Sequence, residues 1–172
     1  AAPEDSSSAC MRDDDDDDFG DDTVSGSITA GSDCDDGDNG INPDATEGVG
    51  DGIDQDCDTN EECYVDADDD GYRLTSTTTS SDLDCTDSGE GRASDPTGDC
   101  DDGSDTTFPG AAPNDSSTAC MRDDDGDDYG DDTAPSGGSA GTDCDDDDNA
   151  VFPGATELPG DSVDQNCDNV EE

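Results

Sequence analysis

A short acidic stretch decides the fold of this chain, and it occurs in three versions. Residues 120–133 read Cys-Met-Arg-Asp-Asp-Asp-Gly-Asp-Asp-Tyr-Gly-Asp-Asp-Thr, and residues 10–23 differ from them only at two places in the loop. Residues 63–72 follow the same plan as Cys-Tyr-Val-Asp-Ala-Asp-Asp-Asp-Gly-Tyr. Each version has Asp at the first, third and fifth positions of a loop and an aromatic residue at the seventh. Carboxylates at this spacing converge on one cation, and the seventh carbonyl adds another oxygen.

We therefore predict three cation-binding loops. They lie outside the EF-hand pattern, because only the middle loop has Gly at position six and none has Glu at position twelve. The predicted loop ligands are Asp13, Asp15, Asp17 and Phe19; Asp66, Asp68, Asp70 and Tyr72; and Asp123, Asp125, Asp127 and Tyr129. The closing ligand must come from further along the chain. The candidates are the aspartates before the next cysteine, Asp33, Asp99 and Asp143, with Asp21 and Asp131 as alternatives.

Two more acidic motifs follow the loops. One is Asp-Cys-Asp-Asp-x-Asp, then Pro, then Ala-Thr-Glu, at residues 33–47 and 143–157, with a partial copy at 99–109; the other spans residues 51–58 and 161–168. Their spacing suits a hard cation, and the competing interpretation is that the aspartates cap turns. The candidate ligands of the first motif are Asp35, Asp36, Asp38, Glu47, Asp101, Asp102, Asp105, Asp145, Asp146, Asp148 and Glu157; those of the second are Asp51, Asp54, Asp56, Asp58, Asp161, Asp164 and Asp168.

The composition excludes several classes of protein. Of 172 residues, 54 are acidic and only four are basic, so the net charge is −50, and 25% are hydrophobic. A conventional core is excluded, since so little apolar surface cannot offset roughly 1–2 kcal/mol of backbone entropy per residue. Nucleic acid is excluded because phosphate contacts need Lys and Arg, and no apolar run approaches the roughly 20 residues of a membrane span. Without His, a nucleophile triad or a phosphate loop, we expect no enzyme.

Disorder is the alternative that such a composition raises, and the cysteines weigh against it. Nine cysteines in so polar a chain favour a disulfide framework in an oxidising compartment. One pairing joins Cys34–Cys57, Cys63–Cys85, Cys100–Cys120 and Cys144–Cys167 and leaves Cys10 for a preceding unit. Pairing Cys10–Cys34 and Cys120–Cys144 leaves Cys167 instead, and the sequence cannot choose between the two.

The chain repeats itself with a period of 110 residues. Residues 1–62 return without a gap as residues 111–172, and residues 63–110 form a divergent half-unit with a Thr/Ser tract. Such repetition predicts a tandem array whose units contact mainly their neighbours. Since the chain begins mid-motif, we expect a segment of a longer polymer or a protomer that a neighbour completes. No amphipathic helix is visible, and short extended pieces are expected near residues 25–29, 72–78 and 150–153.

These motifs carry a family resemblance. The order DADDDGY (66–72), GDCDD (98–102), FPGA (108–111), ATE (45–47) and DGIDQDCD (51–58) resembles the Asp/Cys-rich metal-binding repeats of MopE-type bacterial surface and secreted proteins. It is similar, more loosely, to thrombospondin type-3 calcium repeats. The resemblance implies extracellular, loop-rich modules stapled by calcium. The chain departs from the family where residues 48–50 replace a Cys after ATE, and it lacks the imidazole ligands that a copper role would need.

From these observations we expect an irregular, loop-rich tandem repeat: an extended rod stapled by Ca²⁺ and disulfides, with at most short β pieces and little helix. Oxygen ligands favour several Ca²⁺ ions per chain over zinc or copper. The leading hypothesis is an extracellular or cell-surface structural fibre that self-associates or continues into further repeats. The alternatives are a secreted calcium buffer or mineral-binding protein, and a stalk presenting an adhesin. The sequon at Asn114 is a candidate glycosylation site.

Overall fold

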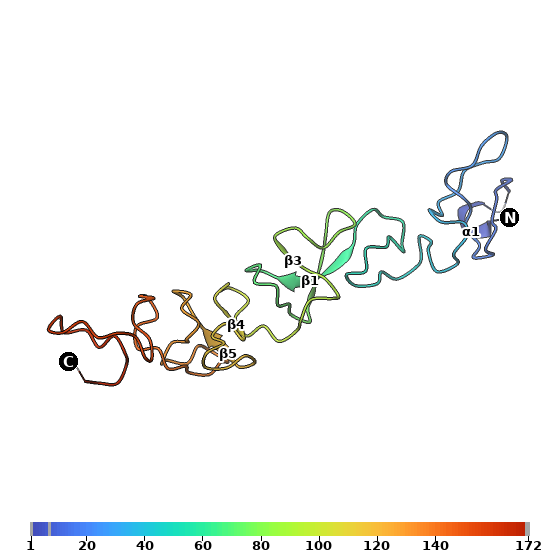
Figure 1. The fold of residues 1–172 in the computed structure, drawn as a ribbon. Helices are drawn as coiled ribbons and strands as arrows, with labels where there is room; N and C mark the ends of the chain where they lie inside the picture. The colour runs from blue at the N-terminus through green and yellow to red at the C-terminus, as the bar shows by residue number, and fades with distance from the viewer. Residues whose placement is uncertain (1, 7, 171–172) are drawn as a thin grey trace. The chain divides into compact units, whose positions relative to one another are not determined.

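Loops and turns make up most of the chain. The computed structural model describes residues 2–6 and 8–170. Within that part, the elements are the helix α1 (Pro3–Ser6) and the strands β1 (Glu62–Asp66), β2 (Thr77–Thr79), β3 (Gly89–Gly91), β4 (Thr107–Pro109) and β5 (Cys120–Arg122), several of which are labelled in Figure 1. None of the described helices is long and apolar enough to span a membrane. The expectation of little helix and only short β pieces is confirmed.

The strands form two small sheets, in which β2 runs antiparallel to β1 and β5 antiparallel to β4. The first has the order β2-β1-β3, with Cys63 opposite Thr78, and the second pairs β4 with β5, with Phe108 opposite Met121. Two of the three expected extended pieces were wrong, since residues 25–29 and 150–153 contain no strand. At 150–153 the backbone N–H groups serve turns instead: Val151 donates to the carbonyl of Asp148. The expected piece at 72–78 contains the start of β2 and an isolated bridge between Arg73 and Thr97.

The chain forms two compact units, each with its own disulfides. Unit 1 is Ala1–Tyr64 with Ser76–Ser94, and unit 2 is Val65–Thr75 with Asp95–Glu172. Of the two pairings open at the sequence level, the structure has the first: Cys34–Cys57 and Cys63–Cys85 in unit 1, Cys100–Cys120 and Cys144–Cys167 in unit 2, at separations of 20 to 23 residues. Loops of this length stabilise by about 3 kcal/mol each in the chain-entropy model. Cys10 is free and exposed.

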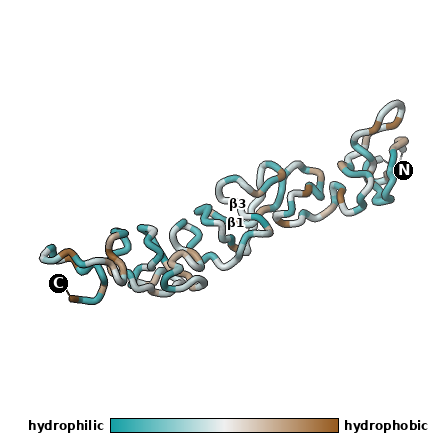
Figure 2. Tube along the Cα trace, viewed as in Figure 1, coloured by the Kyte–Doolittle hydropathy of each residue, from teal (hydrophilic) through white to brown (hydrophobic). Residues whose placement is uncertain are grey.

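Among the described residues, about as many acidic side chains as hydrophobic ones are buried. Figure 2 shows hydrophobic residues scattered along the tube rather than gathered in one place. The buried hydrophobic residues are few and mostly small: Ala2, Phe19, Cys63, Cys85, Ala112, Met121 and Val151. Two aromatic stacks add apolar contact, Tyr72 on Phe108 and Tyr129 on Phe152, with ring centroids 5.4 and 5.6 Å apart. Buried acids are as numerous: Asp21, Asp33, Asp36, Glu61, Asp66, Asp123, Asp143 and Asp146.

The acidic loops require left-handed backbone at two positions. The sixth position has φ of 81° at Asp18, 85° at Gly71 and 77° at Asp128. The fourth position is likewise left-handed, and the N-terminal loop places Asp there as well, at Asp16 with φ 64°. Asp tolerates this conformation better than branched residues do, because its short side chain bonds locally. The preference for Asp therefore serves the loop backbone as well as any ligand.

This backbone requirement predicts a sharp contrast at Asp18. Replacing Asp18 with Val puts a β-branched residue at positive φ and should destabilise the loop by about 1–2 kcal/mol, whereas Asp18→Gly should be close to neutral. Asp22→Val, at an exposed position without positive φ, is the matched control. Thermal unfolding followed by circular dichroism measures all three. Equal melting temperatures for the two valine variants would contradict the strained-loop interpretation.

Candidate metal centres

The loop carboxylates are held in one recurring way. The seventh residue of each loop donates its backbone N–H to the aspartate at position five: Phe19 to Asp17 at 2.8 Å, Tyr72 to Asp70 at 2.6 Å and Tyr129 to Asp127 at 2.8 Å. In all three, the second carboxylate oxygen, Oδ2, is buried and has no hydrogen-bond partner. The backbone thus fixes one oxygen and leaves the other free to face inward.

The N-terminal centre brings five aspartates together. Carboxylate oxygens of Asp13, Asp15 and Asp17 lie within 4.8 Å of one another, and so do those of Asp15, Asp33 and Asp36. A backbone bridge between Asp21 and Asp33 carries the closing aspartate to the loop. The buried Oδ2 atoms of Asp15, Asp17 and Asp33 have no partner. Closely grouped carboxylates with buried, unpaired oxygens form the kind of cluster that a cation completes.

The middle centre repeats this arrangement in unit 2. Oxygens of Asp66, Asp68 and Asp102 lie within 4.8 Å of one another, and Ala67 donates its N–H to Oδ1 of Asp102 at 2.8 Å. The buried oxygens without a partner are Oδ1 of Asp66, Oδ2 of Asp70 and Oδ2 of Asp99. Residues 35 positions apart in the chain are therefore held together here.

The C-terminal centre follows the N-terminal one. Its unpartnered buried oxygens are the Oδ2 atoms of Asp125, Asp127 and Asp143, and a backbone bridge joins Asp131 to Asp143. Asp123 accepts backbone N–H groups on both of its oxygens, from Gly126 and Asp128. At this centre Asp123 serves the loop backbone in addition to its place near the cluster.

Asp33 and Asp21 are joined by a backbone bridge, but their carboxyl pKa values shift in opposite directions. Both are buried, at 0% and 6% exposure. Hydrogen bonds from Thr23, with Arg12 adding to them, lower the pKa of Asp21 below its usual range. Burial, with the charges of Asp17 and Asp15 adding to it, raises the pKa of Asp33 to about 6. Asp21 already has its countercharge, so Asp33 is the better closing ligand. Asp131 is engaged in the same way, by Arg122 and Thr133.

The raised pKa recurs in the other two centres. Burial raises the pKa of Asp70 to about 6, and the charges of Asp68 and Asp99 act in the same direction. Burial also raises the pKa of Asp125 to about 6, with Asp127 and Asp143 contributing. Each centre therefore gathers several negative charges, which Arg12 offsets in the N-terminal centre only at Asp36. A buried carboxylate in this state is costly unless a proton or a cation neutralises it.

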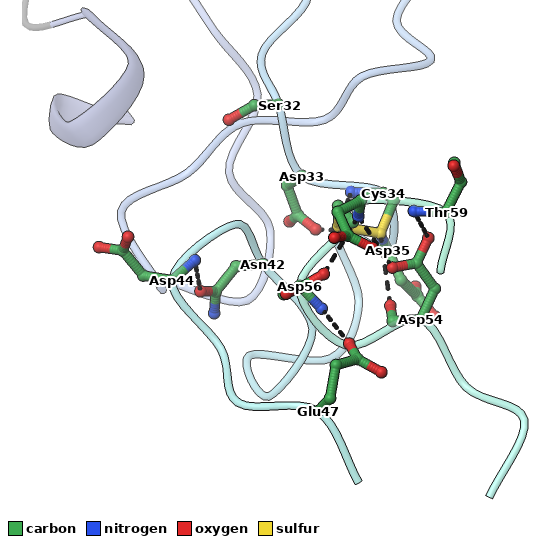
Figure 3. Close-up of a disulfide and its surroundings, with 12 residues drawn as sticks. Ser32, Asp33, Cys34, Asp35, Asn42, Asp44, Glu47, Asp54, Asp56 and Thr59 are labelled. Carbon is green, nitrogen blue, oxygen red and sulfur yellow. Dashed lines mark hydrogen bonds between the residues drawn. A yellow bond between two sulfur atoms is a disulfide. The ribbon is translucent and has the colours of Figure 1, made fainter. Parts of the chain in front are cut away.

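A second type of centre lies beside the Cys34–Cys57 disulfide, as Figure 3 shows. Oxygens of Glu47, Asp54 and Asp56 lie within 4.8 Å of one another. Oε1 of Glu47 accepts the N–H of Asp56 at 2.8 Å, and its Oε2 is buried without a partner. In the second copy Glu157 accepts the N–H of Asn166 at the same distance, and its Oε2 is likewise unpaired.

Several predicted ligands accept turn hydrogen bonds, which is the arrangement that the competing interpretation predicts, and such a bond leaves their role as ligands open. Asp38 and Asp148 accept the N–H two residues ahead, as do Asp58 and Asp168. Asp51 and Asp161 each hold the side-chain amide of a glutamine, Gln55 or Gln165, and Asp164 accepts two backbone N–H groups. Asp36, which also belongs to the N-terminal cluster, pairs with Arg12, and Asp146 pairs with Arg122. The exposed members of the predicted ligand set are Asp35, Asp38, Asp51, Asp58, Asp101, Asp105, Asp145, Asp148, Asp161 and Asp168, and Asn114 is exposed too.

Sequence reasoning missed two kinds of residue. Arg12 contacts Asp14, Asp21 and Asp36, and Arg122 contacts the corresponding three aspartates. Arg12 and Arg122 occupy the same position in the two copies of the repeat, and this recurrence could have indicated their role. Glu61 is fully buried: Oε1 accepts the N–H of Gly50 at 2.9 Å, and Oε2 has no partner. Nothing in the sequence distinguished it from the exposed glutamates, and its counterpart at position 171 lies outside the described residues.

The donor set fits a hard cation. The unpaired buried atoms are carboxylate oxygens, which suit calcium, magnesium or manganese. The cysteines other than Cys10 are joined in disulfides, so no thiolate from them is available for a soft metal. The cluster of Asp143 with Cys144 and Cys167 is therefore a ligand and a disulfide side by side rather than a thiolate site.

Comparison with known proteins agrees with the motif analysis. No curated protein and no solved structure gives a significant match to the chain. A family model described as "Putative metal-binding motif", of the Cu-binding MopE type, matches residues 33–61, 99–113 and 143–172. The matched segments begin at the closing aspartates Asp33, Asp99 and Asp143. The resemblance stated from the sequence is thereby confirmed, and the chain carries the metal-binding motif of MopE-type proteins in three separate segments.

Proposed function

We propose that the chain is an extracellular calcium-binding structural repeat that forms an extended rod or surface fibre. Bound Ca²⁺ and disulfides together give it order. The observation that carries this proposal is the set of buried, unpartnered carboxylate oxygens at three corresponding centres. Native proteins rarely leave such groups unpaired, and a cation at each centre is the simplest partner.

Calcium is favoured over the metals nearest to it in chemistry. Ca²⁺ accepts six to eight oxygen ligands in irregular geometry, whereas Mg²⁺ requires a near-ideal octahedron and keeps its water. The centres mix backbone-fixed carboxylates from a loop with carboxylates from a distant segment, which favours the tolerant ion. Copper, which the family name suggests, prefers imidazole or sulfur donors. The chain has no His and only two Met.

At each centre the chain's own residues do most of the organising. Backbone N–H groups orient the loop aspartates, and the bridges Asp21–Asp33 and Asp131–Asp143 deliver the closing carboxylates. Each ion would supply two positive charges to a site that holds several negative ones. Ordering of the chain is then coupled to binding, because the bare carboxylates repel one another.

A structural role is favoured over that of a calcium buffer because the centres join segments that lie far apart in the sequence. The middle centre joins residues 66–70 to Asp99 and Asp102, so that an ion there would close a long loop. A buffer needs only exposed carboxylates, without such cross-links. The exposed Asn114 and the disulfides suit an extracellular site, and an adhesin carried at the end of a stalk is compatible with the same role.

Calcium removal gives the broadest test. With excess chelator we expect the oxidised protein to expand, with a larger radius of gyration in small-angle X-ray scattering and faster amide hydrogen exchange in residues 10–36. Added Ca²⁺ should reverse both changes, while Mg²⁺ at the same concentration should restore less. Electron microscopy of the same samples would show filaments that soften in chelator. An unchanged radius and exchange pattern without metal would rule the proposal out, and compact monomers with many weak sites would favour the buffer.

The closing ligand is tested by a matched set of amide variants. Asp33→Asn should weaken calcium binding at one centre about tenfold or more, because it removes a charged ligand with no other countercharge. Asp21→Asn should leave calcium affinity nearly unchanged, since Asp21 is engaged by Arg12 and Thr23. Asp22→Asn, which is exposed, controls for the loss of one negative charge. Isothermal titration calorimetry measures the three affinities, and a larger loss for Asp21→Asn would reverse the assignment.

The raised pKa values predict opposite pH trends with and without metal. Without metal, Asp33, Asp70 and Asp125 bind protons more readily when folded than when unfolded, since their pKa values rise from 3.8 to about 6. This contribution to stability is fully present below pH 4 and is lost as pH rises through 6. Calcium competes with those protons, so its affinity should fall as pH drops below about 6. Urea unfolding and calcium titration between pH 4 and 8 measure both trends, and parallel trends would contradict the model.

A further inference from the structure

One sequence segment occurs twice in this chain in two different environments. Cys10-Met11-Arg12 is identical to Cys120-Met121-Arg122, and residues around both copies also correspond. In the second copy these residues form β5, which pairs with β4, and Cys120 bonds to Cys100. In the first copy they form no strand, and Cys10 is free. The two copies therefore act as a comparison within one molecule.

The local fold is the same on the side that both copies share. Thr29 donates its N–H to the carbonyl of Cys10 at 2.9 Å, and Ser139 donates to Cys120 at 2.7 Å. The carbonyl of Arg12 accepts the N–H of Asp21 at 3.2 Å, which the second copy repeats at 3.1 Å. Residues 10–12 are thus already positioned as residues 120–122 are.

The difference lies on the side that β4 covers. Asp123 donates its N–H to the carbonyl of Thr106 at 3.0 Å, and Gly110 donates to the carbonyl of Ala119 at 2.9 Å. Among the residues that the structure describes, the corresponding groups of Asp13 and Ala9 have no such backbone bonds. The side chains follow: Met121 is buried at 7% exposure, whereas Met11 is only partly buried and Cys10 is exposed. An edge of unpaired backbone groups with a half-covered Met is a template for an added strand.

The disulfide pattern points to a strand of the same kind. Three Asp-Cys-Asp-Asp segments, beginning at residues 33, 99 and 143, each bond to a cysteine 20 to 23 residues later. Cys10 matches the closing cysteine Cys120 in sequence and in local structure. Within this chain each Asp-Cys-Asp-Asp cysteine is already used, so Cys10 has no opening partner here.

We propose that residues 9–13 are the acceptor site for a segment that lies outside residues 1–172 and has the pattern of residues 99–110, Asp-Cys-Asp-Asp-Gly-Ser-Asp-Thr-Thr-Phe-Pro-Gly. The segment adds as an antiparallel strand with its Phe opposite Met11, and its cysteine bonds to Cys10. This names the contact by which the fibre proposed above continues, and it rests on that proposal. The contact itself is made by backbone bonds, an apolar residue and a disulfide.

The covalent step is a thiol–disulfide exchange. If the incoming cysteine is supplied as a mixed disulfide with glutathione, the Cys10 thiolate attacks its sulfur, the new disulfide forms and glutathione leaves as the thiolate. No external oxidant is required. The strand contact raises the local concentration of the two sulfurs, so the matching segment should react faster than an unrelated one.

The test uses the whole oxidised protein and a synthetic peptide of residues 99–110 carrying the glutathione disulfide. We expect an adduct at Cys10, located by peptide mapping and mass spectrometry, to form about tenfold faster than with a scrambled peptide that keeps its cysteine in place. Cys10→Ser should give no adduct. Met11→Asp, which leaves the thiol in place, should slow the matching peptide to the rate of the scrambled one.

Equal rates for the matching and scrambled peptides would overturn the proposal, because they would show only an accessible thiol. Preferential pairing of two Cys10 residues from two copies would overturn it as well. Each reaction is run in Ca²⁺ and in chelator, alongside the scattering measurement. If calcium orders the chain but the peptide is not selected, this inference fails while the calcium-dependent fold stands. If the matching peptide is selected but calcium has no effect on the order of the chain, the calcium-dependent fold fails while the acceptor site stands.

Discussion

Neutralising buried negative charge is the constraint on which the rest of this structure depends. With 54 acidic residues against four basic ones, most carboxylates must remain in water or find another partner. Arg12 and Arg122 each contact three aspartates, and those aspartates are largely satisfied. Asp33 and its counterparts are not, although Asp33 and Asp143 are completely buried. Burial of an unpaired carboxylate costs several kcal/mol, and few apolar contacts are available to offset it. In the function proposed above, the same groups that destabilise the bare chain become its centres of order when a divalent cation binds.

Ligand and disulfide are placed at the same points of the chain, and this placement explains how loops without a core keep their geometry. Asp33, Asp99 and Asp143 each directly precede a bonded cysteine. The disulfide limits where the closing aspartate can go in the unfolded chain, and the backbone bridges to Asp21 and Asp131 orient it in the folded one. The loop aspartates are oriented separately, through the N–H of the aromatic residue two positions later. Each centre thus lies where two segments, each held by its own contacts, come close together. A cation there would need only to bind carboxylates that are already in place.

Much of this arrangement was readable from the sequence because it is local. Spacing within a loop predicted that Asp13, Asp15 and Asp17 would cluster, and composition predicted the absence of a core. The disulfide pairing was not readable, since both alternatives close loops of similar length. Nor could the sequence separate ligands from turn caps: Asp38 and Asp36 stand two residues apart in one motif, yet one caps a turn and the other reaches a buried cluster. Glu61 was missed for a related reason, because its burial depends on where residues 50–51 return in space. The strand expected at 150–153 failed because the turn after Asp148 uses the backbone N–H groups of Ala150 and Val151.

The two copies also show which features a centre needs and which it can vary. Glu47 and Glu157 accept the same backbone N–H with one oxygen and leave the other unpaired, although the residue supplying that N–H is Asp56 in one copy and Asn166 in the other. The side chains of Asp56 and Asn166 each accept the backbone N–H of the residue two positions ahead, so the turn requires an oxygen acceptor and not a charge. The charge is then a separate variable, and the second copy has one negative ligand fewer beside Glu157. Since calcium affinity depends on the number of charged ligands, identical turns can hold ions with different strength. Repetition of the fold therefore does not imply repetition of affinity for a metal ion.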